Sequence, residues 1–314
     1  MRDHSAPSSV CNAGSLVGRF QQRDRRALAR LLTLAAHGED QSLLRAAIAA
    51  GEAESSGRVI AITGSAGVGK SSLIGKLIEH FRSKDESVAV LACDPQSPLT
   101  GGALLGDRFR MPSRPEDSGV FIRSLATASG HGAVAEHLEQ MIDVLKAFGF
   151  AWILVETVGA GQGDTAVHGL ADVVVLLLQP EAGDDIQWEK AGLLEIADVV
   201  VIHKADLPGA ERVEAQVRAM LNLPGVREVP IVRVSAAKGT GLQELAALLI
   251  QPPSRGRKGG RARSLLQLAE QELRLRFERP PSPQLAELQE CWSRGEVTDA
   301  EAARAALQLL ASWK

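Results

Sequence analysis

Eight residues, GSAGVGKS at positions 64–71, have the spacing G-x-x-x-x-G-K-[ST] and constrain the fold more than any other segment. The apolar run RVIAIT precedes them at 58–63, and the helix-like stretch SSLIGKLIEHF follows at 71–81. In this strand–loop–helix setting the motif forms a nucleotide-phosphate loop. Its glycines let backbone N–H groups point into a phosphate, and the start of the next helix adds partial positive charge. The sequence therefore predicts that the chain binds a nucleoside triphosphate.

The loop also contains two side chains that can act on a triphosphate. We expect Lys70 to reach the β- and γ-phosphates and the Ser71 hydroxyl to bind Mg²⁺. The residues expected to line the nucleotide here are Gly64, Ser65, Ala66, Gly67, Val68, Gly69, Lys70, Ser71 and Ser72.

From about residue 57, apolar runs of β-type composition alternate with helical patterns. The runs are residues 59–63, 88–93, 120–125, 152–157, 173–179, 198–204 and 230–235. Nearly continuous Val, Ile and Leu indicate strands that are buried on both faces, so an α/β fold with a mostly parallel sheet is predicted. Such sheets bind ligands beyond the carboxyl ends of their strands.

Helical patterns flank this α/β region on both sides. We expect a disordered start and then a helical segment over 1–55, the nucleotide-binding domain over 56–252, and a helical segment over 253–314. Roughly sixty residues of helix are too few for a robust independent core, so the last segment is expected to pack against the main domain or a second copy of the chain.

Composition limits the classes of partner. A net charge of −3 gives no general attraction to nucleic acid or to an anionic membrane. The basic stretch 254–263 favours a solvated linker over a binding patch. The three cysteines have no paired spacing that would suggest a disulfide framework or a zinc site. The longest strongly apolar run, 173–178, is too short to cross a bilayer, and the start lacks a secretory pattern, so a cytoplasmic protein is expected.

Acidic side chains follow two of the predicted strands. Glu156 and Gly159 lie in ETVGAGQGD, where an acid can hold a metal or its waters and a glycine N–H can sense a γ-phosphate. Asp94 ends another strand, and Asp107 lies in a glycine-flanked loop; both are candidate oxygen ligands for Mg²⁺. The alternatives are a turn with a solvated acid for Glu156 and helix caps or turns for the aspartates.

The stretch HKAD at 203–206 resembles the guanine-reading element N-K-x-D, with His203 in place of Asn. Asp206 would accept both guanine N1–H and N2–H₂, contacts that adenine cannot make, and the Lys204 stem would lie along the base. The companion loop SAAKG would place the Ala236 N–H against guanine O6, between Ser235 and Ala237. Together the two elements favour GTP over ATP.

Longer motifs resemble those of the MeaB/ArgK-type GTPases, chaperones of adenosylcobalamin-dependent acyl-CoA mutases such as methylmalonyl-CoA mutase. The resemblance spans about residues 25 to 311. It rests on GSAGVGKSSLI, VAVLACDPQSPLTGGALLGDRFRM, VFIRSLAT, ILVETVGAGQGD, PEAGDDIQWEKAGLLEIAD and HKAD. The resemblance implies a phosphate-loop GTPase domain that binds GTP or GDP with Mg²⁺, a mutase partner that holds the adenosylcobalamin, and a homodimer formed through the C-terminal helices.

The resemblance also assigns roles to particular residues. It implies that Asp94, Asp107 and Glu156 surround the magnesium ion and the hydrolytic water. It further implies that residues 179–190 form a switch, with Lys190 swinging toward the active site. The chain departs from the family pattern at His203, which bears on guanine discrimination, and at 129–132, which bears on partner contacts.

Three functions remain open on the sequence. The leading hypothesis is a slow GTPase that gates adenosylcobalamin loading of its mutase and helps remove damaged cofactor. One alternative is a kinase that transfers phosphate to a protein or a small molecule. The other is a nickel-delivery GTPase, although the seven histidines are scattered and the cysteines unpaired.

Overall fold

A computed structural model of the chain describes residues 15–51, 57–95, 117–127, 133–157, 167–180, 189–223, 227–252, 283–294 and 296–311. The chain divides into two compact units, residues 1–254 and residues 255–314. Within the described residues, no helix has both the length and the apolar character that crossing a membrane requires.

The first unit is built on a seven-stranded sheet with the order β3-β2-β4-β1-β5-β6-β7, and all neighbouring strands pair in parallel. The strands are β1 (Arg58–Gly64), β2 (Val88–Pro95), β3 (Val120–Thr127), β4 (Trp152–Glu156), β5 (Val173–Leu178), β6 (Val199–His203) and β7 (Ile231–Val234). Each predicted apolar run forms one of these strands, so the parallel α/β sheet is confirmed. From β1 the chain first builds the sheet toward β3, and after β4 it builds the sheet toward β7. The strand order therefore reverses next to β1, and parallel sheets of this kind bind ligands at such a reversal.

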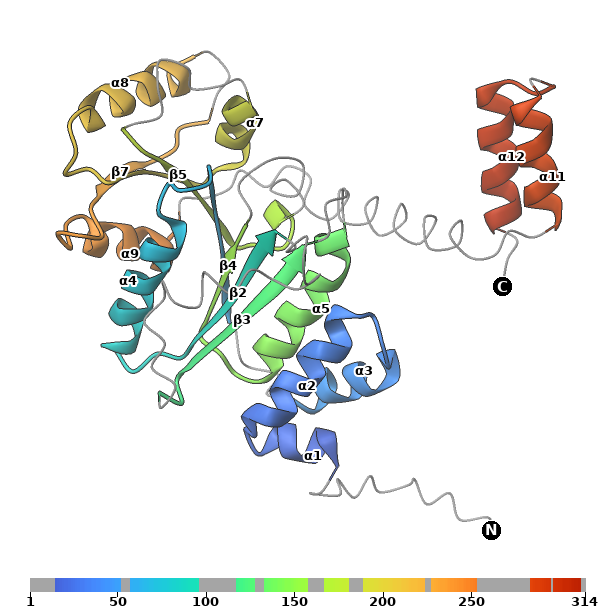
Figure 1. Cartoon of the computed structure of the whole chain (residues 1–314), viewed down its shortest axis with the longest axis horizontal. Helices are drawn as coiled ribbons and strands as arrows, with labels where there is room; N and C mark the ends of the chain where they lie inside the picture. The colour runs from blue at the N-terminus through green and yellow to red at the C-terminus, as the bar shows by residue number, and fades with distance from the viewer. Residues whose placement is uncertain are drawn as a thin grey trace, which may run out of the picture. The chain divides into compact units, whose positions relative to one another are not determined.

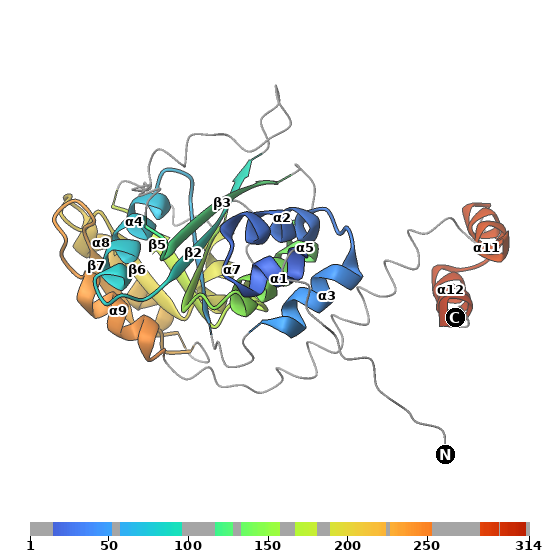
Figure 2. The same cartoon turned by 90° about the horizontal axis from the view of Figure 1, so that it is seen from below.

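Helices cover both faces of the sheet (Figures 1 and 2). On one face lie α1 (Leu16–Gln21), α2 (Arg25–Ala36), α3 (Gln41–Ala50), α5 (Ala133–Ala147), α7 (Glu189–Ile196) and α8 (Ala210–Leu221). On the other lie α4 (Lys70–Arg82) and α9 (Leu242–Ile250). Alternate residues of β1 pack into the hydrophobic cores on the two faces of the sheet: Val59 and Ala61 face α5, whereas Ile60 and Ile62 face α4. Burial on both faces explains why the strands read as continuous apolar runs.

The predicted N-terminal helices belong to the first unit. Arg25 of α2 donates hydrogen bonds to the carbonyl oxygens of Asp117, at 3.0 Å, and of Val120. Arg123 of β3 donates in the opposite direction, to the Ala29 carbonyl at 3.1 Å and the Thr33 hydroxyl at 3.2 Å. These contacts fasten α2 to the edge strand β3.

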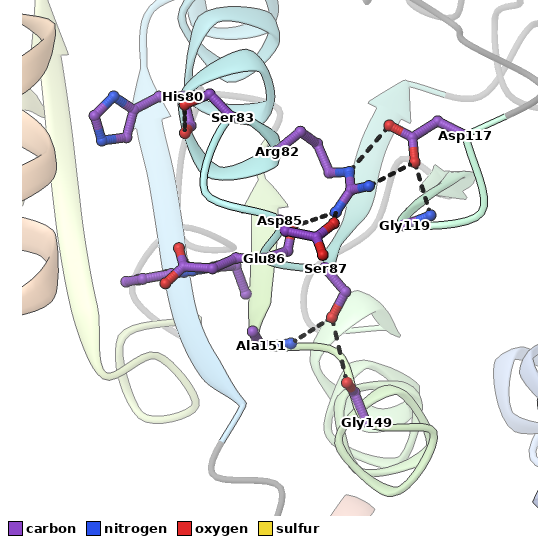
Figure 3. Close-up of polar contacts among 11 residues, drawn as sticks. His80, Arg82, Ser83, Asp85, Glu86, Ser87, Asp117, Gly119, Gly149 and Ala151 are labelled. Carbon is purple, nitrogen blue, oxygen red and sulfur yellow. Dashed lines mark hydrogen bonds and ion pairs between the residues drawn. The ribbon is translucent and has the colours of Figure 1, made fainter.

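The amino ends of the strands are held by a polar network at the end of α4 (Figure 3). Arg82, the last residue of α4, meets both carboxylate oxygens of Asp117 at 3.0 Å, and this hydrogen bonding raises the pKa of Arg82. Glu86 accepts a 2.8 Å hydrogen bond from the Trp152 indole N–H. Because Lys70 is the first residue of the same helix, the network fixes the far end of the element that begins at the phosphate loop.

The second unit contains α11 (Pro283–Ser293) and α12 (Asp299–Ala311), which pack against each other. A capping box opens α12: the Thr298 N–H donates to Glu301 at 3.0 Å, and the Glu301 N–H donates to the Thr298 hydroxyl at 3.4 Å. Trp292 and Leu307 are 51% and 49% exposed. An apolar groove of about 300 Å³ runs along the pair, lined by Leu285, Leu288, Gln289, Trp292, Asp299, Ala302, Ala303 and Ala306.

Candidate nucleotide site

The phosphate loop lies between the end of β1 and the start of α4. Gly67 and Gly69 have φ values of +76° and +101°, a left-handed backbone that disfavours other residues. A Cβ atom at Gly69 would also lie 2.4 Å from the Cε1 atom of His203, so there is no room for a side chain. At Gly67, by contrast, no atom of the described residues lies within 4 Å of the Cβ position. The loop therefore presents an open, backbone-lined surface, which suits a phosphate.

The Lys70 side chain folds back over this loop. Its ammonium donates hydrogen bonds to the carbonyl oxygens of Gly64, at 2.9 Å, and Ser65, at 3.2 Å, and the residue is only 7% exposed. The first turn of α4 and the Lys70 charge therefore combine in one place. Both attract a polyphosphate.

Ser71 and Glu156 meet at the carboxyl edge of the sheet. The Ser71 hydroxyl donates a 2.8 Å hydrogen bond to the Glu156 carboxylate, and both residues are buried. Asp94 lies on the same edge, because its strand pairs with β4 at Ala92 and Glu156 and Asp94 is two residues further along. A hydroxyl beside a carboxylate is a set of hard oxygen donors, so the residues present fit a magnesium ion.

The predicted base-reading loop, residues 203–206, begins at the end of β6 and is bonded to the loop after β7. The Ala205 N–H donates to the Val234 carbonyl at 3.1 Å, and the Ser235 hydroxyl donates to the Asp206 carboxylate at 2.5 Å. The hydrogen bond from Ser235 lowers the pKa of Asp206, so this carboxylate is ionised at neutral pH. An ionised acceptor held by a fixed hydroxyl is what recognition of two N–H groups on guanine requires.

Two contacts join the base-reading loop to the phosphate loop. The Nδ1 atom of His203 lies 2.8 Å from the Val68 carbonyl oxygen, and the Lys204 ammonium donates to the Gly67 carbonyl at 3.3 Å. His203 is 3% exposed, and this burial lowers its pKa. The two halves of the predicted nucleotide site are therefore in direct contact.

The described residues cover only part of the predicted site. Asp107 and Gly159 lie outside them, as do residues 129–132 and 181–188. Asp94 and Lys190 are placed by their backbones alone, at the end of β2 and in the first turn of α7. The structure brings together Lys70, Ser71 and Glu156 on one side and His203, Lys204, Asp206 and Ser235 on the other; Ala236 and Ala237 follow directly on Ser235.

Two buried threonines beside Glu156 were not among the predicted site residues. Ile62 of β1 pairs with Glu156 of the neighbouring strand β4. Thr63 directly follows Ile62, and Thr157 directly follows Glu156. Both are at least 95% buried, and neither hydroxyl has a hydrogen-bond partner among the described residues. Because buried hydroxyls are normally satisfied, these two are available to a ligand or an ordered water. A threonine that ends an apolar strand is common, so only the burial marks them.

A parallel α/β sheet with a phosphate loop at its central strand, a hydroxyl–carboxylate pair beside it and a base-reading loop opposite defines a P-loop nucleotide-binding protein of the GTPase type. Comparison with known families is more specific. The family model described as methylmalonyl-CoA mutase-associated GTPase MeaB matches residues 28–272, and the chain belongs to this family.

Two relatives agree with this assignment, and a solved structure shares the fold. A protein of Pyrococcus abyssi named as a GTPase is 43% identical over 238 residues, which cover 73% of this chain and 72% of that protein. The fused isobutyryl-CoA mutase of Geobacillus kaustophilus is 39% identical over 209 residues, 64% of this chain but 19% of the fusion. The crystal structure of an LAO/AO transport system kinase shares the fold, with a TM-score of 0.62 and 22% identity, over 98% of this chain and 100% of that one.

Proposed function

We propose that this GTPase is a chaperone of an adenosylcobalamin-dependent acyl-CoA mutase. It converts GTP and water to GDP and phosphate slowly by itself and faster with its client. Its nucleotide state gates the loading of adenosylcobalamin, which belongs to the mutase, and helps remove damaged cofactor. The observation that carries the proposal is the direct contact between two loops, one with Lys70 and the Ser71–Glu156 pair and the other with Asp206.

Each of these residues has a role in the proposed reaction. The phosphate loop and the Lys70 ammonium bind the β- and γ-phosphates and neutralise charge at the bond that breaks. Asp206, held by Ser235, accepts the guanine N1–H and N2–H₂ groups. Ser71 and Glu156, with Asp94 at the same edge, would hold a magnesium ion. When bound, Mg²⁺ supplies positive charge that stabilises a phosphoryl group in transfer.

A low intrinsic rate is supported by how the buried titratable groups of the described site are engaged. Glu156 accepts the Ser71 hydroxyl, and His203 is bonded to Val68. Burial lowers the pKa of His203, so its imidazole is a weak base, and the Glu156 carboxylate is already bonded to a hydroxyl. A partner that completes the site would then raise the rate, as GTPase activators do.

The mutase as client is supported by the family and by fusion. The Geobacillus relative joins a segment similar to this chain to an isobutyryl-CoA mutase in one polypeptide. In a fusion, the linker holds the two domains at a high effective concentration. Where two such domains are separate chains, they often bind each other instead. We therefore expect this chain to bind a mutase of the acyl-CoA class.

The proposal is tested by the rate of GTP hydrolysis with and without purified adenosylcobalamin-dependent acyl-CoA mutases. We expect a slow basal rate and at least about tenfold acceleration by the client, which is well below the roughly 10³-fold that an activating arginine supplies. ATP serves as the matched control nucleotide, because adenine lacks the two N–H groups that Asp206 accepts. Equal rates with every mutase would contradict the chaperone role, and equal use of ATP would contradict the assignment of Asp206.

We further propose that the chain is a homodimer, with α11 and α12 in the interface. The exposed Trp292 and Leu307, and the apolar groove beside Trp292, support an interface there, because large apolar side chains are costly to leave in water. Light scattering on the full chain is expected to give twice the chain mass of 33.3 kDa, and a monomer at micromolar concentration would refute the dimer.

A further inference from the structure

The contact between His203 and Val68 spans a strand. His203 ends β6, Val68 lies in the loop that follows β1, and β5 lies between these two strands in the sheet. The imidazole reaches the phosphate loop all the same, and its ring packs against Gly69, where a Cβ atom would come within 2.4 Å of it. The ring therefore occupies the space that the glycine leaves free.

The chemistry of the contact determines the state of the ring. A carbonyl oxygen can only accept, so Nδ1 must carry the proton that bonds to Val68. In the neutral ring Nε2 then has only a lone pair, and this atom is buried without a hydrogen-bond partner among the described residues. A second proton on Nε2 would place a buried charge with no acceptor, which is far more costly than a buried lone pair.

The charges around the ring do not remove this cost. Burial has the largest effect and lowers the pKa of His203, whereas the hydrogen bond to Val68 raises it. In its own loop, Lys204 disfavours a positive charge on the ring and Asp206 favours one, and the pKa stays lowered overall. In the phosphate loop packed against it, the charged side chain is Lys70, whose ammonium is bound to the Gly64 and Ser65 carbonyls. Beyond β7, Lys238 acts on Asp206. The closed contact therefore requires the neutral imidazole.

We infer that His203 is a positioning residue that ties the phosphate loop to the base-reading loop through its neutral imidazole, and that it thereby makes nucleotide affinity fall as the solution becomes acidic. The inference rests on the proposed GTPase function, because it concerns the same nucleotide site. A site with both loops held in place loses less entropy on binding, so breaking the contact weakens nucleotide binding.

The sign of the pH effect follows from proton linkage. When the contact opens, the ring is hydrated and its pKa returns toward the ordinary value of 6.5, whereas in the closed site the pKa lies lower. The open form thus binds a proton more readily, and below about pH 6.5 it gains population by up to tenfold for each pH unit. Affinity is full above that pH and declines below it.

The test is the affinity for GDP at pH 7.5 and 5.5, measured by calorimetry on the full chain. The terminal phosphate of GDP also titrates near pH 6, so the informative quantity is the pH effect in the wild type relative to that in His203→Asn. Asparagine keeps an N–H donor but cannot ionise. We expect the wild type to lose more affinity at pH 5.5 than this variant, by up to about tenfold.

Two further variants separate positioning from packing. His203→Phe keeps an aromatic ring but removes the donor, and it is expected to weaken GDP binding about tenfold at pH 7.5, whereas His203→Asn stays within about threefold of the wild type. His80→Asn is the matched control: this partly buried histidine of α4 also has a pKa lowered by burial, but it lies at the far end of the helix (Figure 3). Its pH effect on GDP binding should equal that of the wild type.

The outcomes distinguish this inference from the proposed function. Equal pH effects in the wild type and His203→Asn, or equal affinities of His203→Phe and His203→Asn at pH 7.5, would overturn the inference while leaving the GTPase assignment intact. Failure of the wild type to bind GDP at both pH values would overturn the proposed function and the inference with it.

Discussion

Replacing Lys70 by alanine is expected to lower the affinity for GTP at least about 100-fold, the largest effect of any single substitution in the site. The ammonium is the buried positive charge of the phosphate loop, and a charge-assisted hydrogen bond to a phosphate contributes about 1.5–3 kcal/mol. Alanine also removes the two hydrogen bonds that hold the Gly64 and Ser65 carbonyls, so the loop loses part of its support. Both changes act in the same direction.

Lys76→Ala provides the matched control, because Lys76 lies on the same helix and its ammonium meets Glu79 at the surface, 2.8 Å away. An exposed pair of this kind contributes at most about 1 kcal/mol, so GTP affinity should stay within about twofold of the wild type. Titration with GTP measures both variants, and urea unfolding checks that Lys70→Ala is folded. If folded Lys70→Ala bound GTP within threefold of the wild type, the assignment of the phosphate loop would be wrong.

The strands of the sheet could be predicted from the sequence for a physical reason. Strands that are covered on both faces need apolar residues at every position, and the run Val173 to Leu178 shows this in its purest form, with all six residues buried. The same pattern located all seven strands. It carries no information on their order, because apolar side chains do not specify which neighbour they pack against.

Only part of the nucleotide site could be predicted from the sequence. Its phosphate loop was predicted because glycine spacing, a lysine and a hydroxyl are local features with a fixed geometry. The contact of His203 with Val68 joins residues far apart in sequence across an intervening strand, so no local pattern predicts it. The same holds for Thr63 and Thr157: their hydroxyls matter because of burial, and burial is a property of the assembled fold.

Glu156→Gln is expected to lower the rate of GTP hydrolysis about 100-fold while GDP affinity stays within about threefold of the wild type. Glutamine matches glutamate in shape, and its amide oxygen can still accept the Ser71 hydroxyl now bound at 2.8 Å, so the strand end and the loop stay in place. What is lost is one buried negative charge among the oxygen donors that suit a divalent cation.

A 100-fold loss corresponds to about 2.7 kcal/mol of transition-state stabilisation, as expected for one buried charged group. Glu86→Gln is the matched control, because Glu86 also accepts a 2.8 Å hydrogen bond in this sheet, from Trp152, but at the opposite ends of the strands (Figure 3). Its hydrolysis rate should equal that of the wild type. Phosphate release at saturating GTP measures the rate, and calorimetry measures the affinity. Equal losses of rate and affinity in Glu156→Gln would show that the carboxylate supports nucleotide binding in general, whereas a loss of rate alone assigns it to the chemical step.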